Sequence, residues 1–474
     1  MGNLESLQYF LPEIVIVIAL LFTIILDLLG YRKYILPFVL SACTLIGILL
    51  YGQGYSDKHI FLGMLTLDSL SYYFKCIILL STTSIILISN YSRVLDKEYQ
   101  SEYNMLLLSI LLGMFLMTSA VNLIMIYLAI ELVSIPSYIL AGILKNDKKS
   151  NEASLKYVIF GSFASGLMLY GLSLLYGVTG SFDLAVISES MSTVSNPYFL
   201  YTTFILILVG FGYKISMAPM HYWTPDVYEG SPTTITAFLS VAPKAAGFAI
   251  LIRFFLGIFD TSIVNIIDWT LVIAILSAAT MTIGNVLALR QTNVKRMLAY
   301  STISHVGFML MAFSTASIEA TVGIAFYMTM YMFMSLSSFY MVIFAENKLN
   351  AKNIEDWAGL GYKNMILGSF MVVSLVSLAG LPPTSGFIGK VYLFKVLFSE
   401  EKFYWLAIIG VINSVISLYY YFKIVKSMYF KELDKPESVV AHPVVHWSII
   451  ILSSQNLLFY FYWEPLYNYI TSIF

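Results

Sequence analysis

The chain has 474 residues, of which 59% are hydrophobic and only 11% are charged. Soluble domains carry about 25% charged residues, so the composition excludes an ordinary soluble protein and predicts an all-α polytopic membrane protein. The formal net charge is −1, whereas a nucleic-acid-binding protein presents a basic surface. We therefore expect the lipid bilayer as a partner and no nucleic acid.

Fourteen apolar runs approach or exceed the length of about 20 residues that a bilayer-spanning helix needs. In chain order they cover residues 10–29, 35–51, 67–90, 104–120, 122–144, 154–178, 198–218, 233–258, 269–289, 294–314, 320–345, 365–398, 403–429 and 445–470. The run 365–398 is too long for one straight helix and contains Pro382 and Pro383. Because proline breaks the backbone hydrogen-bond ladder, we expect this helix to be discontinuous.

The loops between these runs differ sharply in positive charge. Odd-numbered loops and the adjoining helix ends hold 18 Lys and Arg residues, and even-numbered loops hold two, Lys58 and Lys402. Cytoplasmic loops are enriched in Lys and Arg, so this alternation predicts cytoplasmic odd loops and both termini on the non-cytoplasmic side. One odd loop, 219–232, has Asp226 and Glu229 but no Lys or Arg. It is either a docking or gating segment or a tight turn that caps two helices.

Several charged residues remain inside the predicted spans. Glu131 is the one carboxylate in the middle of a span, and six basic residues lie within spans: Lys75, Lys214, Lys244, Arg253, Lys390 and Lys395. For Lys75, Arg253 and Lys395 an alternative is that the side chain extends to the lipid headgroups. Lys244 is near mid-span, and Lys214 and Lys390 are next to helix-breaking sequence, so these three have no such simple explanation.

A central lysine costs about 2.5–3.5 kcal/mol on membrane-insertion scales. Glu131 can neutralise only one or two lysines at once, so the lysines are in excess of what static ion pairs would need. Burial favours the neutral amine and a nearby carboxylate favours the charged form, so a lysine between these influences can take up and release a proton. Ionisable residues inside membranes commonly mark ion paths. We therefore favour a proton relay over a set of static buried ion pairs.

Two histidines are further candidates for proton transfer. His305 lies mid-span beside Tyr300, Ser301 and Ser304, and His221 lies at the end of the Lys214 helix. Histidine titrates near physiological pH, which suits a relay. The alternative for a lone membrane histidine is a hydrogen bond to one neighbour.

A short pattern, GFxxK, occurs twice at an offset of 176 residues, ending at Lys214 and at Lys390. Pro219 follows the first copy, and Pro382 and Pro383 precede the second. Interrupted helices at corresponding positions of two halves indicate a transport site. Each repeat would contain about five spans, and an odd number of spans makes the two copies inverted. The predicted organisation is a three-helix segment at 1–100, repeats at 101–260 and 261–432, and a C-terminal helix at 433–474.

Motifs for cofactors and metals are missing from the sequence. Cys43 and Cys76 are the only cysteines and form no CxxC, so we expect no iron–sulfur cluster or zinc site. We find no Walker A motif and no GxGxxG following a strand, so no nucleotide site is expected. His442 and His446 have metal-ligand spacing, but Pro443 intervenes and no acidic residue is near. We therefore predict no bound cofactor and no metal in this chain.

Three long motifs resemble one family. They are MAPMHYWTPDVYEGSPTTITAFLSVAPKAAGFAILIRFF at 217–255, GNVLALRQTNVKRMLAYSTISHVGFML at 284–310 and LAGLPPTSGFIGKVYLF at 378–394. They look like subunit N of proton-translocating NADH:quinone oxidoreductase, respiratory complex I. The combination of TPDVYEG with PKAAGF favours subunit N over the related antiporter-like subunits. Thr234 departs from the family pattern, where proline is expected, and this bears on turn geometry.

The resemblance implies a fold of 14 transmembrane helices with two inverted five-helix repeats and discontinuous helices 7 and 12. It also implies roles for matching residues. Glu131 would pair with Lys214, Lys244 would be the central relay lysine, and Lys390 would lead to the exit side. His221 and His305 match positions that bridge the relay.

The resemblance further implies that partner subunits bind the NADH, FMN, iron–sulfur clusters and quinone. The chain would translocate protons, coupled to electron transfer elsewhere in the complex. Its partners would be other membrane-arm subunits, and its location a bacterial inner membrane. Two alternatives remain: a subunit of a multi-subunit sodium/proton antiporter, and a structural scaffold that moves no ion.

Overall fold

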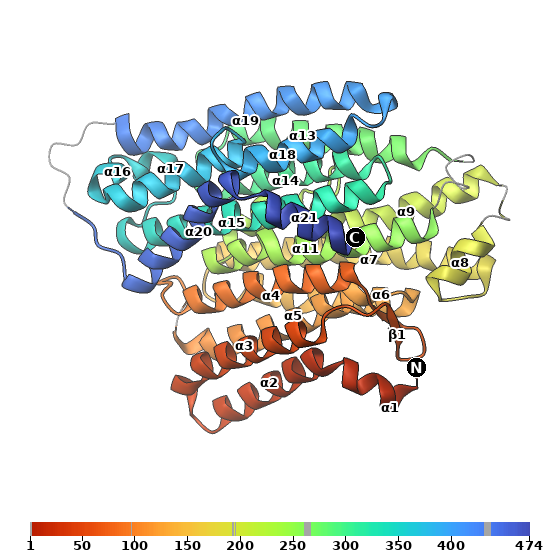
Figure 1. The fold of residues 1–474 in the computed structure, drawn as a ribbon. Helices are drawn as coiled ribbons and strands as arrows, with labels where there is room; N and C mark the ends of the chain where they lie inside the picture. Colours follow the sequence, from red (N-terminus) through yellow and green to blue (C-terminus); the bar gives the residue numbers. More distant parts are fainter. Residues whose placement is uncertain (1, 96, 192–193, 195, 260–266, 431–437) are drawn as a thin grey trace. The chain divides into compact units, whose positions relative to one another are not determined.

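The computed structural model describes residues 2–474 except 96, 192–193, 195, 260–266 and 431–437. They form two compact units (Figure 1). Unit 1 comprises Met1–Asn90, Asp96–Ile215 and Ala242–Thr270, and unit 2 comprises Tyr91–Leu95, Ser216–Val241 and Leu271–Phe474. The predicted domain boundaries at 260/261 and 432/433 lie outside the described residues.

Unit 1 is a bundle of long helices around α5. Helix α5 packs on α2, α4 and α6, and α7 packs on α6 and α9. The helices of this unit are α1 (Asn3–Ser6), α2 (Leu11–Leu28), α3 (Ile35–Gln53), α4 (Ser69–Ser89), α5 (Gln100–Ser119), α6 (Leu123–Ala141), α7 (Lys148–Thr179), α8 (Leu184–Met191), α9 (Pro197–Ile215) and most of α11 (Thr233–Ile258), with 3-10 turns at Leu7–Tyr9, Arg32–Tyr34 and Lys97–Tyr99.

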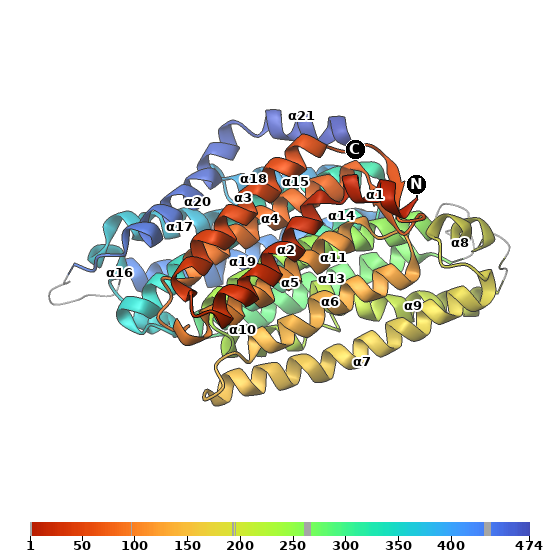
Figure 2. The same ribbon diagram turned by 90° about the horizontal axis from the view of Figure 1, so that it is seen from below.

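The 32-residue helix α7 shows how local sequence defines these elements. Asp147 caps its start by accepting a hydrogen bond from the backbone N–H of Lys149, and Gly180 ends it in the left-handed conformation. Figure 2 shows α7 running alongside α6 and α9. Because α6 and α7 are neighbours, polar groups in the middle of either helix can satisfy one another.

Unit 2 is built around α15, which is buried along nearly its whole length. Helices α14, α17, α18 and α20 pack against it. The helices of this unit are α10 (Trp223–Gly230), most of α13 (Trp269–Leu289), α14 (Val294–Phe313), α15 (Ile318–Leu349), α16 (Leu360–Lys363), α17 (Met365–Ala379), α18 (Ser385–Leu397), α19 (Tyr404–Phe430), α20 (Pro443–Phe461) and α21 (Glu464–Ile473), with 3-10 turns at Ile354–Trp357 and Glu401–Phe403.

Among the described residues, 12 helices are long and apolar enough to cross a membrane. They coincide with 12 of the 14 predicted spans. The span 294–314 is the helix α14, whose first turn carries Lys295 and Arg296 and which is not among the 12. The span 365–398 is two helices, α17 and α18, so the predicted break is confirmed. The predicted span 445–470 is too long, because α20 ends at Phe461 and a separate helix, α21, begins at Glu464.

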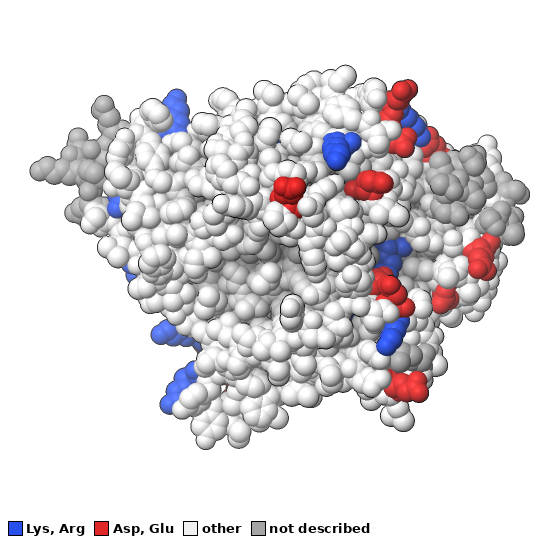
Figure 3. Space-filling model, in the orientation of Figure 1, with Lys and Arg blue, Asp and Glu red and all other residues white. Residues whose placement is uncertain are grey.

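The other predicted break is also present. Helix α9 ends at Ile215 and α10 begins at Trp223, so the helix is interrupted just after Lys214; α10 itself lies in the predicted loop 219–232. Strands in the described part of the chain are limited to one antiparallel hairpin, β1 (Lys58–Ile60) with β2 (Leu65–Leu67), inside a loop. Most of the face drawn in Figure 3 is uncharged, as expected for a surface that meets lipid.

Candidate functional site

Lys214 lies in the last turn of α9, one residue before the helix ends. Its side chain is buried, and its Nζ donates a hydrogen bond to the hydroxyl of Ser134 on α6, at 3.0 Å. Helix α11 approaches this point closely through Gly247. A Cβ at Gly247 would lie 2.7 Å from the Ile215 side chain, so only glycine permits this contact.

Glu131 lies on α6, one turn before Ser134, and is half-buried. Its carboxylate accepts a hydrogen bond from the hydroxyl of Ser165 on α7. Residues three apart share a helix face, so the Lys214 amine reaches the same face of α6 that carries Glu131. Among the described residues no ion pair within 4.0 Å includes Glu131. Glu131 and Lys214 thus lie near each other, but each bonds to a serine, Glu131 to Ser165 and Lys214 to Ser134.

Lys244 is the most enclosed of the three lysines, with 1% of its surface exposed. Its Nζ has no hydrogen-bond partner in the described part of the chain. Pro243, inside the helix, removes one backbone donor beside it. A buried charge without a partner costs several kcal/mol, so the protein offers the charged form of Lys244 little stabilisation. Gly247, on the same face of α11, is the point at which this helix meets the Lys214 turn.

Lys390 lies on α18, just after the break between α17 and α18, and is buried. Its Nζ donates to the carbonyl oxygen of Ala379, at 2.9 Å. Ala379 is the last residue of α17, where carbonyls lack helical partners and the helix dipole is negative. The broken helix therefore supplies the acceptor for this cation. The amine also lies 4.6 Å from the centre of the Phe308 ring, a cation–π arrangement.

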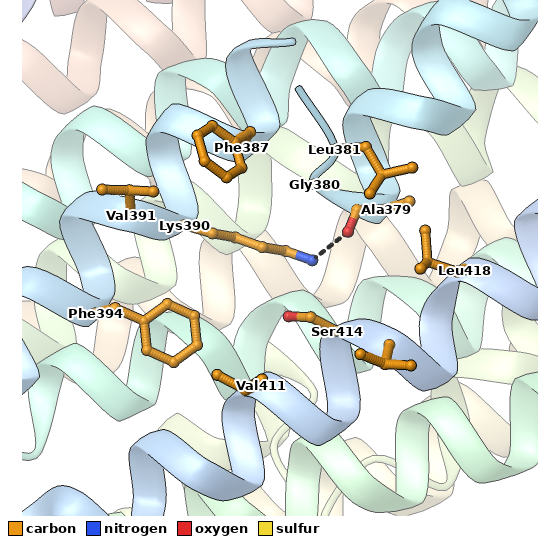
Figure 4. A pocket seen from close by; sticks show the side chains of 11 residues that line it. Ala379, Gly380, Leu381, Phe387, Lys390, Val391, Phe394, Val411, Ser414 and Leu418 are labelled. Carbon is orange, nitrogen blue, oxygen red and sulfur yellow. Dashed lines mark hydrogen bonds between the residues drawn. The ribbon is translucent and has the colours of Figure 1, made fainter. Parts of the chain in front are cut away.

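Gly380 makes the approach of Lys390 possible. It has a φ of +81° and ends α17 in the left-handed conformation. A Cβ there would lie 2.7 Å from Cδ and 3.0 Å from Nζ of Lys390. Beside the amine lies a cavity of about 210 Å³ (Figure 4). Its walls are mainly apolar, and the hydroxyl of Ser414 on α19 borders it.

His305 on α14 is buried between two tyrosines from other helices. Its Nδ1 is 2.6 Å from the Tyr327 hydroxyl on α15, and its Nε2 is 3.2 Å from the Tyr421 hydroxyl on α19. Tyr421 also bonds to Ser301. Both ring nitrogens are thus occupied, which suits a residue that passes a proton between hydroxyl groups. Phe308, one turn along α14, is the ring beneath Lys390.

His221 lies in the turn between α9 and α10 and is buried. Its ring stacks on Tyr222 with centroids 4.7 Å apart. Its Nδ1 has no hydrogen-bond partner among the residues that the structure describes. Unit 1 thus gathers Glu131, Lys214 and Lys244, and in unit 2 the ring of Phe308, one turn from His305 on α14, contacts the Lys390 amine. His221 stands apart from that second group.

Comparison with known proteins identifies the family. Residues 120–417 match the family described as "NADH:quinone oxidoreductase/Mrp antiporter, TM". NADH-quinone oxidoreductase subunit N 2 of Sorangium cellulosum (strain So ce56) is 42% identical over 495 residues, covering 99% of this chain and 97% of the relative. The chain belongs to the NADH-quinone oxidoreductase subunit N family. The resemblance of its motifs to subunit N is therefore confirmed.

Solved structures agree with membership of the subunit N family. A chain of respiratory complex I from Thermus thermophilus superposes with a TM-score of 0.78 at 28% identity, covering 94% of this chain and 96% of that one. A chain of the Mrp complex from Dietzia sp. DQ12-45-1b also has a TM-score of 0.78, but at 19% identity it shares the fold alone, over 98% of this chain and 96% of that one. The antiporter alternative is thus the weaker one. As a family member with 12 candidate spans, the chain is an integral multi-pass membrane protein.

This subunit N homologue also contains a buried ion pair that the sequence did not reveal. Lys75 on α4 bonds to Glu13 on α2, with Nζ 2.6 Å from Oε1, and both side chains are almost fully buried. The alternative that the Lys75 side chain extends to the headgroups is therefore wrong. Each residue is visible in the sequence as a charge in an apolar span. However, 62 residues separate Glu13 from Lys75, and no sequence pattern indicates that they pair.

Arg253 does not reach the headgroups either. Its guanidinium forms two hydrogen bonds, of 2.6 and 2.7 Å, with the carboxylate of Asp68 and also donates to the carbonyl of Thr118. Asp68 precedes α4 and caps it through the N–H of Ser71. Burial raises the pKa of the Asp68 carboxyl, but the Arg253 charge and the hydrogen bonds from Arg253 and Ser71 lower it more, so the net pKa is below its ordinary value.

The acidic loop 219–232 forms ion pairs within unit 2. It contains α10, and Arg296 at the start of α14 bonds to both Asp226, at 2.5 Å, and Glu229, at 3.1 Å. The loop is thus not a tight turn but a short helix whose two acidic residues bind Arg296. His442, one of the two histidines with metal-ligand spacing, has a structural role. It caps the start of α20, and its ring stacks on that of Tyr91, with centroids 4.3 Å apart.

Proposed function

We propose that this chain is the proton-translocating membrane-arm subunit of an NADH:quinone oxidoreductase. The observation that carries the proposal is the set of three lysines buried in apolar helices. Two lie beside helix breaks with a single oxygen acceptor each, and the third, Lys244, has no acceptor among the described residues. Purely structural lysines would be expected to have carboxylate partners, as Lys75 does.

In this proposal the proton affinity of each lysine changes in turn. Glu131 bonds to Ser165 and Lys214 bonds to Ser134, so the two charged groups are not locked together. Movement of the Glu131 carboxylate toward or away from Lys214 therefore changes how strongly the charged amine is stabilised. Lys244, which the fold stabilises least when charged, passes its proton on most readily. Lys390 receives the proton, and its ammonium group donates a hydrogen bond to the Ala379 carbonyl oxygen. His221 and His305 act as bridging groups.

Redox chemistry belongs, in this proposal, to partner subunits of the complex. They bind the NADH, FMN, iron–sulfur clusters and quinone, and this chain carries no redox group. We further propose a bacterial inner membrane, with both termini on the non-cytoplasmic side. The two GFxxK segments mark inverted five-helix repeats at 101–260 and 261–432, flanked by 1–100 and 433–474.

The test replaces Lys244 with methionine, which has a similar length and no charge. We expect the assembled complex in inverted membrane vesicles to lose most NADH-driven proton uptake, measured with a pH-sensitive dye. Lys395→Met is the matched control, because Lys395 lies exposed near the end of α18. Undiminished pumping by assembled Lys244→Met would refute the proposed role.

The two alternatives make different predictions in the same vesicles. A sodium/proton antiporter subunit would exchange sodium for protons without any electron donor. A scaffold would show reduced assembly in Lys214→Met and Lys390→Met, with normal pumping in whatever complex still assembles. The 42% identity to a subunit N over almost the whole chain favours the oxidoreductase.

A further inference from the structure

The cavity beside Lys390 has a composition that a proton path alone does not require. Lys390 and Ser414 are the only polar side chains among its lining residues. Its walls are built from valine, leucine and phenylalanine side chains of α18, α19 and the segment after α17. A cavity of about 210 Å³ with one charged end and apolar walls matches the shape of an amphiphile, not of an inorganic ion.

The two polar groups converge as hydrogen-bond donors. An ammonium has three N–H donors, and Lys390 directs one of them to Ala379. The Ser414 hydroxyl oxygen is buried and has no hydrogen-bond partner in the described part of the chain. Figure 4 shows the Lys390 amine and the Ser414 hydroxyl near one another among the residues that line the cavity. Two neighbouring donors suit a carboxylate, which has two acceptor oxygens.

The mouth of the cavity lies on the outer surface of the helices. Val391, Val411 and Val415 border it and are 43%, 52% and 61% exposed. Val411 and Val415 are the eighth and twelfth residues of the 27-residue α19, about 12–18 Å from its start at 1.5 Å per residue. In a spanning helix that depth is hydrocarbon, so the cavity opens toward acyl chains.

We propose that this cavity is a lateral binding site for a long-chain carboxylic acid, a free fatty acid of the bilayer. In its protonated form such an acid is uncharged and enters hydrocarbon readily. Transfer of its proton to the neutral amine of Lys390 leaves a carboxylate and an ammonium, with no change in net charge. A phospholipid does not fit, because its headgroup stays at the membrane surface.

The head of the acid, and not its chain, determines binding. Membrane lipid is as apolar as the cavity walls, so moving methylene groups from one to the other gains little. The carboxylate gains charge-assisted hydrogen bonds from Lys390 and Ser414 that an ester or alcohol cannot form in the same way. Occupancy would hold Lys390 in its charged form, and an effect on pumping follows only if the proposed function is also correct.

The test is photolabelling of the assembled complex in lipid vesicles with palmitic acid that carries a diazirine in its chain. We expect label in the peptides of α18 and α19 that border the cavity. Excess palmitate should remove this label, and methyl palmitate should leave it. Lys390→Met should lower the label about tenfold, as expected for the loss of charge-assisted hydrogen bonds.

Two tryptophan substitutions distinguish labelling inside the cavity from labelling of the lipid-facing helix surface. Val415→Trp fills the mouth and should remove the label, whereas Ile451→Trp, on the exposed surface of α20, which contributes no residue to the cavity lining, should not. Equal competition by methyl palmitate, or equal labelling of Val415→Trp and wild type, would overturn the proposal. So would label no stronger than on other lipid-facing helices, which would mean that water alone fills the cavity. None of these results depends on whether Lys390 pumps protons.

Discussion

Single residues decide how each lysine is held. Lys214 relies on a serine hydroxyl, Lys390 on a helix-end carbonyl, and Lys244 on no described group. A glycine stands next to each contact. Gly247 lets α11 approach the Lys214 turn, and Gly380 both ends α17 and leaves room for Lys390. The positions of the Lys214 and Lys390 amines therefore depend on neighbouring glycines, which carry no charge themselves.

Gly380→Ala tests this dependence. Alanine in the left-handed conformation costs about 1–2 kcal/mol, and its methyl group would also displace Lys390 from Ala379. We expect lower thermal stability and reduced NADH-driven pumping. Gly180→Ala is the matched control, because Gly180 has a φ of +64° but no atom within 4 Å of an added Cβ. It should lose similar stability and pump normally; equal pumping by both variants would contradict the idea.

At the scale of helices, buried ion pairs join elements that are distant in sequence. Glu13 and Lys75 connect α2 to α4, and Asp68 and Arg253 connect the start of α4 to the end of α11. Breaking one partner of a buried pair costs about 3–5 kcal/mol, because the remaining charge is left alone. Replacing both partners with neutral residues of similar size costs far less.

Lys75→Met should therefore strongly reduce the amount of assembled subunit and its thermal unfolding temperature. The double variant Glu13→Gln/Lys75→Met should recover most of that loss. Pumping per assembled complex should be unchanged in the double variant, since the pair lies outside the proposed relay. A double variant as unstable as the single one would show that the pair itself is required.

Asp68→Asn should weaken the attachment of α11, because it removes the carboxylate that Arg253 holds with two hydrogen bonds. The pKa of Asp68 is lowered in the folded protein, so its stabilising contribution is complete above the ordinary value of 3.8 and is lost as the pH falls through the folded pKa. We expect wild type and Asp68→Asn to differ in unfolding temperature at pH 7. The difference should shrink only in strong acid; a difference that already vanishes near pH 6 would contradict this assignment.

At the scale of the whole chain, much of the fold could be predicted because it follows from length and composition. Twelve spans and both helix breaks follow from apolar runs and prolines. The positions of Glu131 and the lysines are visible as charges in apolar surroundings. The groups that bind them cannot be predicted from the sequence, because hydroxyl and carbonyl groups occur throughout the chain. With 35 tyrosines in the chain, nothing in the sequence selects Tyr327 and Tyr421 as the neighbours of His305.

The orientation of the chain can be tested with topology reporters. Because positive charge alternates between loops, alkaline phosphatase fused after Phe474 should be active, as it is only outside the cytoplasm. A fusion after Asp147, in the odd loop between α6 and α7, should be inactive. The reverse result at either position would mean that the positive-inside rule has been misapplied to this chain.

The burial of α11 has a consequence for biosynthesis. The insertion machinery meets each segment as it is made. Lys244 adds about 2.5–3.5 kcal/mol near the centre of α11, and Arg253, nearer the end of the helix, adds a smaller cost. Asp68 and Thr118, which bind Arg253, both precede α11 in the chain. The acceptors of Arg253 are therefore already made when α11 emerges from the ribosome. The order of the sequence is thus also an order of assembly, in which Arg253 is made after the groups that bind it.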